Sequence, residues 1–305
     1  MITNFDDLLK QSLTVKGKRV AIVFPNNEET FSAVKDALKV DLAEFVLVGD
    51  TATIKKYLPG ENRGVEIVPS PNVASALDQT LALIRSGKAD ILMKGSVDTS
   101  TMMRAVLREE TGIRTGRLLS DVFVFEFPPR TENKLIMITD GGITLAPDLK
   151  EKVEIIKNAV EVAHALGNTN PKVAVLSATE FVLPNLQSTV DAALLAKMSE
   201  RGQIKGCVVE GPLALDNAIS PEAAAEKNLT SPVAGKAEIL LAPSIETANC
   251  LAKGTTYFAG LRLAHVIVGG KVPILIPSRA DKSDAKLLSI ALGVTMSEFY
   301  AKKES

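Results

Sequence analysis

A cluster of reactive residue types follows a short apolar run near the end of the chain. The run covers residues 272–276, and the cluster that follows it consists of Ser278, Arg279, Asp281 and Asp284. A guanidinium binds phosphate through a planar set of donors, a hydroxyl can hydrogen-bond a sulfur or an oxyanion, and a carboxylate can accept a proton. The same spacing fits an ordinary helix cap at Ser278 or Asp281, so both interpretations stay open from these residues alone.

A second loop, residues 93–107, also follows an apolar run and opens a predicted helix. Its candidate substrate-binding residues are Lys94, Gly95, Ser96, Thr99 and Arg104. Glycine lets the backbone approach a ligand, and free N–H groups at a helix N-terminus attract anions. The loop lacks the spacing of a Walker A motif. A helix cap with a solvated lysine explains it equally well.

Three more loops at the ends of apolar runs each carry candidates. Asp140, with Gly141 beside it, can orient a ligand hydroxyl or hold its own loop through an Asx-turn. Glu210 precedes a tight Gly-Pro turn, and Asn249 stands inside a predicted helix, where its modest helix propensity suggests a role. Each of these residues also has a purely structural explanation.

The strands that position these loops are predicted from short, continuous apolar runs, as in parallel strands buried on both faces. They are expected at 19–24, 45–48, 65–68, 90–93, 121–125, 134–139, 172–176, 206–210, 238–241, 266–268 and 272–276. Amphipathic helices lie between them, one of them preceded by a capping box at Asp148 and Glu151. This alternation predicts doubly wound α/β domains, in which ligands sit at the carboxyl ends of the strands.

The length of 305 residues favours two domains. GKADILMKGSVDT (87–99) and GKAEILLAPSIET (235–247) are similar, either because the chain has two related lobes facing across a cleft or because any two βα units share this composition. The Gly- and Pro-rich segment 141–147 is the candidate boundary, and 269–271 the candidate return. We therefore expect 1–144 with 271–305 to form one α/β domain, and 145–270 an inserted second one.

Composition excludes several classes of function. The formal net charge is −1, from 35 basic and 36 acidic residues, and there is no Trp, which disfavours nucleic-acid binding. Cys207 and Cys250 are isolated, so neither a zinc site nor a disulfide framework is expected. No apolar run is long enough to span a membrane and the acidic N-terminus has no signal-peptide pattern, so a cytoplasmic protein is expected.

Together the strand-end loops predict a cleft for a phosphorylated or anionic ligand. The sequence has no zinc cluster, no GxGxxG fingerprint and no GxSxG elbow. Group transfer without a metal or a nicotinamide is therefore the expected chemistry.

Five motifs, in order from about residue 91 to the end, resemble the phosphate acetyltransferase and phosphate butyryltransferase family. They are MKGSVDT, TDGGI, EGPLALDNAIS, SPVAGKAEILLAPSIETAN and VPILIPSRAD. GPLALDNAIS and SRAD are more similar to the butyryl branch. The resemblance implies two α/β domains with an inter-domain cleft, as in isocitrate and isopropylmalate dehydrogenases, and assembly as a homodimer or a larger homo-oligomer.

The resemblance also implies a reaction: reversible transfer of an acyl group, butyryl or a branched short chain, between coenzyme A and inorganic phosphate. The ligands are then acyl-CoA, phosphate and acyl phosphate, with CoA as a substrate and no tightly bound cofactor. Carried over, Arg279 holds phosphate and Ser278 hydrogen-bonds the thiol or the developing oxyanion. A carboxylate deprotonates the thiol; because Ala285 stands where the acetyl enzymes have their aspartate, Asp284 is ranked first and Asp281 second.

A second departure concerns the helix after the TAN-like turn. Where the acetyl enzymes carry a substrate arginine, this chain has Tyr257 and Phe258, which suits a longer or branched acyl chain and leaves Lys94 or Arg104 to bind phosphate. Phosphate acetyl transfer is the alternative reaction. Two other classes stay open: a dehydrogenase, whose aspartate cluster and nicotinamide loop are not found, and a non-catalytic protein that binds CoA or acyl phosphate.

Overall fold

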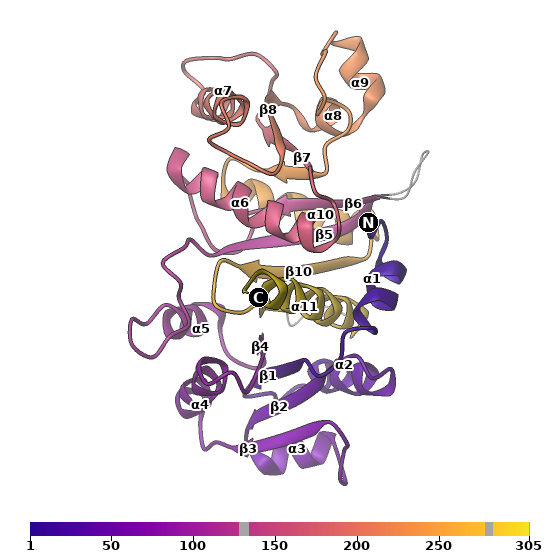
Figure 1. The fold of residues 1–305 in the computed structure, drawn as a ribbon, viewed down its shortest axis with the longest axis vertical. Coiled ribbons are helices and arrows are strands. Elements are labelled where there is room, and N and C mark those ends of the chain that lie inside the picture. The colour runs from indigo at the N-terminus through magenta and orange to yellow at the C-terminus, as the bar shows by residue number, and fades with distance from the viewer. Residues whose placement is uncertain (128–133, 278–282, 305) are drawn as a thin grey trace. The chain divides into compact units, whose positions relative to one another are not determined.

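The structure, a computed structural model, describes residues 1–127, 134–277 and 283–304 (Figure 1). The chain forms two compact units: unit 1 is Met1–Asn4 with Leu118–Leu263, and unit 2 is Phe5–Arg117 with Ala264–Ser305. These limits differ from the predicted ones at 144/145 and 270/271. The Gly- and Pro-rich segment 141–147 is the loop between a strand and a helix inside unit 1, so its composition marks a turn of the chain within that unit.

Unit 2 is built on a mostly parallel sheet with the strand order β3-β2-β1-β4-β11-β10. Its strands are β1 (Arg19–Val23), β2 (Glu44–Gly49), β3 (Val65–Pro69), β4 (Ile91–Lys94), nearly all of β10 (Leu263–Val268), and β11 (Ile274–Leu275). β11 runs parallel to β4 and antiparallel to β10. The last strand in the sequence therefore lies in the interior of this sheet.

Apart from α1, which precedes β1, each helix of unit 2 follows one of its strands. They are α1 (Phe5–Ser12), α2 (Glu28–Lys39), α3 (Thr51–Tyr57), α4 (Val73–Arg85), α5 (Thr99–Val106) and α11 (Ser283–Glu304). Four of them begin at an Asn or Asp cap whose side chain accepts a backbone N–H three residues further on: Asn27, Asp50, Asn72 and Asp98. α11 is buried on all sides from residue 288 to residue 297, so it serves as the core helix of the unit.

Unit 1 has the strand order β5-β6-β9-β7-β8. Its strands are β5 (Ser120–Phe127), β6 (Lys134–Thr139), β7 (Lys172–Leu176), β8 (Val208–Leu213) and β9 (Ile239–Leu241), and its helices are α6 (Leu149–Ala165), α7 (Gln187–Glu200), α8 (Leu215–Ile219), α9 (Pro221–Glu226) and α10 (Ile245–Tyr257). β5 and β6 are antiparallel, and β6, β9, β7 and β8 are parallel. A core of buried aliphatic residues, among them Ile138, Ala174 and Leu240, lies within this unit.

The predicted α/β class is confirmed, and each predicted strand has a counterpart. The sheets are not fully parallel, however, because β5 pairs with β6 and β10 with β11 in the antiparallel sense. The predicted strand 272–276 shortens to Ile274–Leu275, since the proline at 273 has no N–H to give to a neighbouring strand. The predicted capping box is confirmed: Asp148 Oδ1 accepts the Glu151 N–H at 2.8 Å, and Glu151 Oε2 accepts the Asp148 N–H at 2.9 Å.

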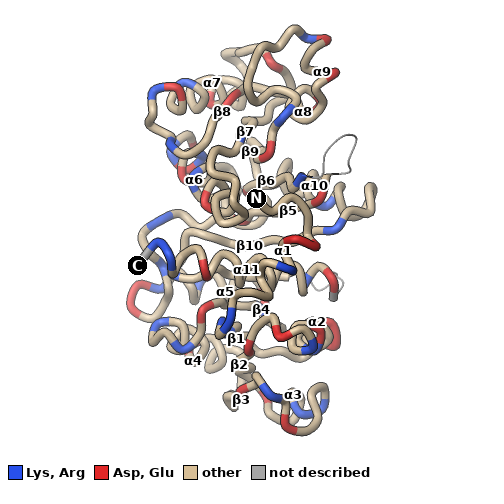
Figure 2. Tube along the Cα trace, turned by 45° about the vertical axis from the view of Figure 1, so that its right-hand side comes forward, with Lys and Arg blue, Asp and Glu red and all other residues tan. Residues whose placement is uncertain are grey.

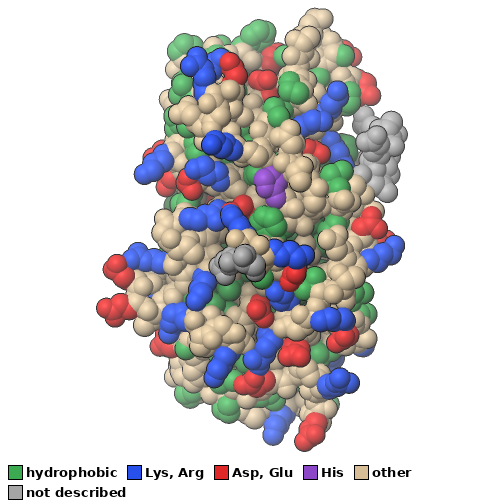
Figure 3. Space-filling view, viewed as in Figure 1, with side chains coloured by type: hydrophobic (Ala, Val, Ile, Leu, Met, Phe, Trp, Pro, Cys, Tyr) green, Lys and Arg blue, Asp and Glu red, His purple; other side chains and the backbone are tan. Residues whose placement is uncertain are grey.

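Charge is distributed along the whole chain. Lys and Arg alternate with Asp and Glu along the trace in Figure 2, and basic and acidic side chains are interspersed on the face seen in Figure 3. None of the helices in the described ranges combines the length and the apolar character needed to cross a bilayer.

Candidate functional site

In unit 2, the loop after β4 carries a buried cation. Lys94 is the last residue of β4 and is only 7% exposed, although the alternative interpretation from the sequence had it solvated. Its Nζ donates to the carbonyl oxygen of Val97 at 3.4 Å. A buried ammonium is costly unless it is compensated, and the Val97 carbonyl is one of the groups that compensate it.

Gly95 and Ser96 join this loop to the loop after β1. A Cβ on Gly95 would lie 2.2 Å from the carbonyl oxygen of Val23, and the backbone N–H groups of Gly95 and Ser96 donate to Val23 O and Phe24 O, each at 3.0 Å. The Ser96 hydroxyl contacts Asn26 Oδ1 and accepts from Asn27 Nδ2. The close approach of these two strand-end loops therefore explains by packing alone why a glycine stands at position 95.

The start of α5 is capped by an aspartate rather than by a serine or threonine. Asp98 accepts the N–H of Thr101 and the hydroxyl of Ser100, each at 2.7 Å. Hydrogen bonding by the Thr101 side chain, followed by that of the Ser100 side chain and the Thr101 N–H, holds the pKa of Asp98 well below its usual range. Thr99 is the first residue of the helix. Arg104 donates to Thr101 Oγ1 at 3.1 Å on the exposed side of α5, so its guanidinium is held on its own helix.

β11 ends beside β4. Leu275 pairs with Met93 in parallel register, so the chain leaves β11 level with Lys94 and its loop. Ser278, Arg279 and Asp281 lie outside the described residues. Asp284 is described; it stands in the first turn of α11 and is exposed.

In unit 1, Asp140 holds the loop after β6. It is 3% exposed. Its Oδ1 accepts the N–H groups of Asp121, Gly142 and Ile143 at 3.0 to 3.1 Å, and its Oδ2 accepts that of Thr144 at 2.9 Å. Burial raises the pKa of Asp140, and the hydrogen bond from Gly142 offsets part of that rise. Of the two roles that the sequence allowed, holding the loop is the one these contacts provide.

The helix α10 is tied to the same loop. Asn249 Nδ2 donates to the carbonyl oxygen of Gly141 at 2.9 Å. A Cβ on Gly141 would lie 2.8 Å from the ring of Phe123 and 3.2 Å from the backbone nitrogen of Asn249. Asp140, Gly141 and Asn249 are therefore brought together, as one loop-and-helix junction.

Glu210 and the pair Tyr257 and Phe258 lie elsewhere in unit 1. Glu210 Oε1 accepts the N–H of Gly211 at 3.0 Å and borders a cavity of about 510 Å³ between α7 and β8. Tyr257 and Phe258 stand at the end of α10 and are 66% and 96% exposed. Both aromatic side chains are therefore largely open to solvent.

Comparison with known proteins gives the family. Residues 65–294 match the sequence profile of the phosphate acetyl/butaryl transferases. The chain is similar to the phosphate butyryltransferase of Clostridium acetobutylicum, with 45% identity over 297 residues that cover 96% of this chain and 97% of that protein. It is also similar to the phosphate acetyltransferase of Thermotoga maritima, with 42% identity over 283 residues, 91% of this chain and 94% of that protein.

The chain belongs to the phosphate acetyl/butaryl transferase family. This confirms the family, and the transferase class, predicted from the five motifs. A solved branched-chain phosphotransacylase from Enterococcus faecalis is 31% identical with a TM-score of 0.83, and the match covers 92% of this chain and 99% of that one. A 4-hydroxythreonine-4-phosphate dehydrogenase from Klebsiella pneumoniae, at 11% identity and a TM-score of 0.55 over 92% of this chain and all of the other, shares the fold alone.

Unit 2 also holds two buried titratable side chains that the sequence analysis did not count among the candidate site residues. His265, in β10, is 7% exposed, and Lys286, in the first turn of α11, is 2% exposed. The sequence did contain a signal that Lys286 is buried. It lies four residues before Ile290 and seven before Gly293, so helical periodicity places it on the same face of the last helix as these apolar and small residues. Among the described residues, no group of three or more His, Cys, Asp or Glu is gathered as metal ligands are.

Proposed function

We propose that this protein transfers a short acyl group, butyryl or a branched chain, reversibly between coenzyme A and inorganic phosphate. The observation that carries the proposal is the similarity along nearly the whole chain to proteins named phosphate butyryltransferase, at 45% and 46% identity for the two Clostridium proteins. The branched-chain phosphotransacylase structure, at 31% identity, supports the same acyl class.

The proposed chemistry needs a base, an anion site and a donor to the carbonyl oxygen. A carboxylate, Asp284 or Asp281, takes the proton from the CoA thiol. The thiolate then attacks the carbonyl carbon of acyl phosphate, forming the C–S bond of acyl-CoA as the C–O bond to phosphate breaks and inorganic phosphate leaves. In this proposal Arg279 binds the phosphoryl group, and Ser278 donates to the developing oxyanion.

Lys94 supports an anion site at the same strand ends. It is buried at the end of β4, and β11, which leads into Ser278, runs beside it. We propose that Lys94, with Ser96, Thr99 and the backbone of Gly95, lines this site. Arg104 is a weaker candidate, because its guanidinium is hydrogen-bonded to Thr101 on the exposed side of α5. In unit 1, the contacts of Asp140, Gly141 and Asn249 support a positioning role, and Glu210 is kept only as a proposed contact.

The acyl preference is assigned to Tyr257 and Phe258, whose exposed rings offer apolar surface to a four-carbon chain. Replacing Tyr257 by Arg is expected to lower activity with butyryl-CoA more than with acetyl-CoA. Phosphate acetyl transfer is the second candidate function, favoured by the 42% identity to an acetyltransferase. An unchanged ratio of the two activities in the variant would remove Tyr257 from the proposal.

Phosphate-dependent release of free thiol from acetyl-, propionyl-, butyryl- and isobutyryl-CoA tests the proposal directly. Fast release from the four-carbon substrates is expected, while a preference for acetyl-CoA would select the acetyl reaction. No release from any of them by folded protein, together with CoA binding, would select a non-catalytic CoA-binding protein. Arg279→Ala is expected to raise the KM for phosphate and to lower turnover, and wild-type kinetics in that variant would exclude the role of Arg279.

The cytoplasmic location and the homodimeric or larger assembly implied by the family resemblance remain predictions. Cell fractionation tests the first of them. Light scattering on the purified protein tests the second.

A further inference from the structure

The loop after β1 has an uncommon backbone conformation. Phe24 follows the strand with a φ of 48°, in the left-handed region that residues other than glycine seldom occupy. Its N–H donates to the carbonyl oxygen of Val48 at 2.8 Å, and its carbonyl oxygen accepts the Ser96 N–H at 3.0 Å. A residue keeps such a conformation only where its surroundings impose it, and such residues gather at functional sites. β2 and the loop after β4 therefore fix the course of this segment.

This course brings two asparagines against Ser96. β1 and β4 pair in parallel register up to their last residues, so the two loops leave the sheet side by side. The Ser96 hydroxyl donates to Asn26 Oδ1, and Asn27 Nδ2 donates to Ser96 Oγ at 3.2 Å. The orientation of the Asn27 amide is set by its second bond, in which Oδ1 caps α2 by accepting the Thr30 N–H at 2.9 Å.

The hydrogen bonds of this cluster, Asn26, Asn27 and Ser96, leave Ser96 able only to accept. A serine hydroxyl has one hydrogen to donate and two lone pairs. Asn26 takes the hydrogen and Asn27 uses one lone pair, so one lone pair is left for a ligand. Asn26 offers the opposite group, because its side chain is exposed and its Nδ2 has no partner within the described ranges. The cluster thus presents one acceptor beside one donor.

The charge around the cluster disfavours a phosphoryl group in direct contact with it. Three exposed carboxylates stand within two residues of its members: Glu28 and Glu29 in the first turn of α2, and Asp98 at the cap of α5. Like charges repel at this range, and an oxygen that can only accept offers nothing to a phosphate oxygen. The cluster therefore suits a neutral ligand that carries both an N–H and a carbonyl oxygen.

One part of coenzyme A has this chemistry. Its pantetheine arm is uncharged, ends in the thiol and contains two secondary amides, each with an N–H and a carbonyl oxygen. In the proposed reaction the thiol must reach the carbonyl carbon that is bonded to the phosphoryl group. That phosphoryl group is assigned to the site at Lys94, two residues before Ser96. The arm must therefore pass the border of this site.

We propose that Asn26, Asn27 and Ser96 form a subsite for the pantetheine arm of CoA. Ser96 Oγ accepts an amide N–H and Asn26 Nδ2 donates to an amide carbonyl oxygen, while Asn27 is a positioning residue that holds the Ser96 hydroxyl. The inference rests on the proposed function. It also refines the site at the strand ends, because Ser96 then contacts the thiol substrate at the border of the anion site and not the phosphoryl group itself.

The test uses three neutral substitutions: Asn26→Ala, Ser96→Ala and Asn27→Ser. Serine is as good a helix cap as asparagine, so Asn27→Ser removes the Nδ2 donor and keeps the cap. The matched control is Asn72→Ser at the start of α4, where the asparagine Oδ1 likewise accepts an N–H three residues on, that of Ser75 at 2.9 Å. KM values are measured for butyryl-CoA, butyryl-pantetheine and phosphate. The rise of the thermal midpoint on adding CoA or phosphate is a readout without turnover.

In Asn26→Ala and Ser96→Ala, the KM for butyryl-CoA is expected to rise about three- to tenfold, as for one lost hydrogen bond. The KM for butyryl-pantetheine should rise by the same factor, because both substrates share the arm, and the CoA-induced thermal shift should fall. The phosphate KM and the phosphate-induced shift should not change. Asn27→Ser should raise the KM for butyryl-CoA as well, but not when Ser96 is already alanine, since it acts through that hydroxyl. Asn72→Ser should change none of these values.

Three results would overturn the proposal. The first is wild-type KM values for butyryl-CoA in both Asn26→Ala and Ser96→Ala. The second is a raised phosphate KM with an unchanged CoA KM in Ser96→Ala, which would place the hydroxyl on the phosphoryl group. The third is a rise confined to butyryl-CoA and absent with butyryl-pantetheine, which would place the contact on the nucleotide. If Asn27→Ser lowers the ligand-free thermal midpoint more than Asn72→Ser does, Asn26→Ala, at an exposed position, decides.

Failure of the proposed function is separable from failure of this inference. Wild-type protein that turns over no acyl-CoA, but is stabilised by CoA through Ser96 and Asn26, would retain the subsite and lose the reaction. Wild-type protein that turns over butyryl-CoA, with unchanged KM values in all three variants, would retain the reaction and lose the subsite.

Discussion

Asn249 Nδ2 and the carbonyl oxygen of Gly141 lie 2.9 Å apart, joining residues 108 positions apart in the sequence. Through this bond, α10 holds the loop that Asp140 organises after β6. The backbone approach is close, since a Cβ on Gly141 would lie 3.3 Å from the carbonyl carbon of Ala248. The bond therefore sets how the start of α10 meets the end of β6.

Replacing Asn249 by Leu is expected to lower the free energy of unfolding by about 1–2 kcal/mol, because the Gly141 carbonyl loses its donor in a partly buried place. Urea unfolding measures the effect. Cys250→Ser, at the exposed neighbouring position, serves as the control and should change stability by less than about 0.5 kcal/mol. If the Leu variant instead keeps its stability and raises a substrate KM, Asn249 contacts the substrate.

Replacing Gly95 by Ala is expected to destabilise the protein by about 2 kcal/mol or more. The added Cβ meets backbone atoms of Val23 and Phe24 at 2.2 to 2.9 Å, which cannot move aside as a side chain can. Gly254→Ala is the matched control, because that helical position has only Phe258 Cδ2 at 3.8 Å. This control is expected to gain about 0.5–1 kcal/mol from helix propensity. Equal stability of the two variants in thermal unfolding would contradict the packing role of Gly95.

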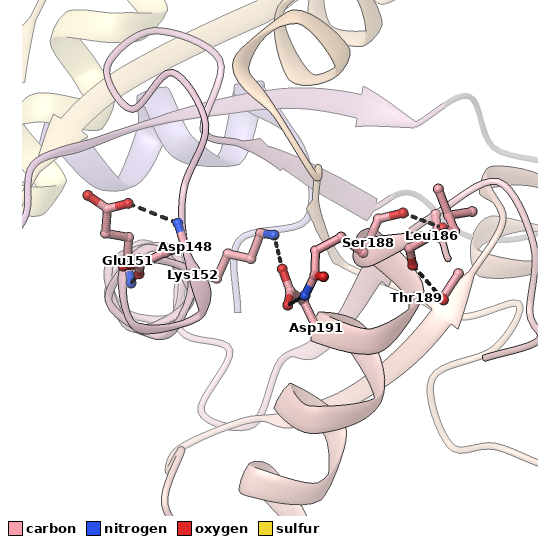
Figure 4. A network of polar contacts seen from close by, with 9 residues as sticks. Asp148, Glu151, Lys152, Leu186, Ser188, Thr189 and Asp191 are labelled. Carbon is pink, nitrogen blue, oxygen red and sulfur yellow. Dashed lines mark hydrogen bonds and ion pairs between the residues drawn. The ribbon is translucent and has the colours of Figure 1, made fainter. Parts of the chain in front are cut away.

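Lys152 and Asp191 form a buried ion pair between α6 and α7, with Nζ and Oδ2 2.5 Å apart (Figure 4). Their side chains are 6% and 8% exposed, and Gln187 Nε2 donates to the other Asp191 oxygen at 2.8 Å. Lys152→Met leaves a buried carboxylate without its cation and should cost about 3–5 kcal/mol. Changing Asp191 to Leu as well should restore part of the loss.

The control for this pair lies on the same helix. Lys157 pairs with Glu154 at 2.7 Å on the surface of α6, with side chains 44% and 30% exposed. Lys157→Met is expected to change the free energy of unfolding by about 0.5 kcal/mol at most. Similar losses for both lysine variants, measured by urea unfolding at one ionic strength, would mean that burial does not set the strength of the inner pair.

The two thiols are expected to differ in reactivity. Burial raises the pKa of the Cys207 thiol to about 11, so only about one thousandth of it is thiolate at pH 8. Cys250 is exposed. An aromatic disulfide reagent should titrate one fast thiol per native chain at pH 8 and a second after unfolding. Cys250→Ser should abolish the fast reaction, and a fast thiol that persists in this variant would contradict the burial of Cys207.

The sequence predicted those features that depend on neighbours along the chain. The apolar run from Lys134 to Thr139 is a strand with those bounds, and Asp148 with Glu151 is a capping box, because strand burial and helix capping leave local patterns. The partner of Asn249 and the close contact behind Gly95 could not be predicted, since both come from segments that only the folded chain brings together.

The structure differs from the sequence interpretation at two places, for identifiable reasons. Lys94 was given a solvated alternative because lysine is rarely buried, yet the end of β4 lies inside the sheet and carries the side chain with it. The domain limits were placed at a Gly- and Pro-rich segment, 141–147, but such composition marks any tight loop, and the units change at Arg117 and Leu263 instead. Lys286 on α11 was not considered as a candidate site residue, because the sequence of that helix is apolar nearly all round.

The position of β11 and α11 within unit 2 affects the order in which the two units can fold during synthesis. β11 lies between β4 and β10, and α11 is the buried helix beside it, yet both are translated after all of unit 1. Since domains generally fold as units as they emerge from the ribosome, residues 118–263 can complete their core during synthesis. Unit 2 must wait with an open sheet until its final segment leaves the exit tunnel, and this nascent state is where chaperone dependence is to be sought.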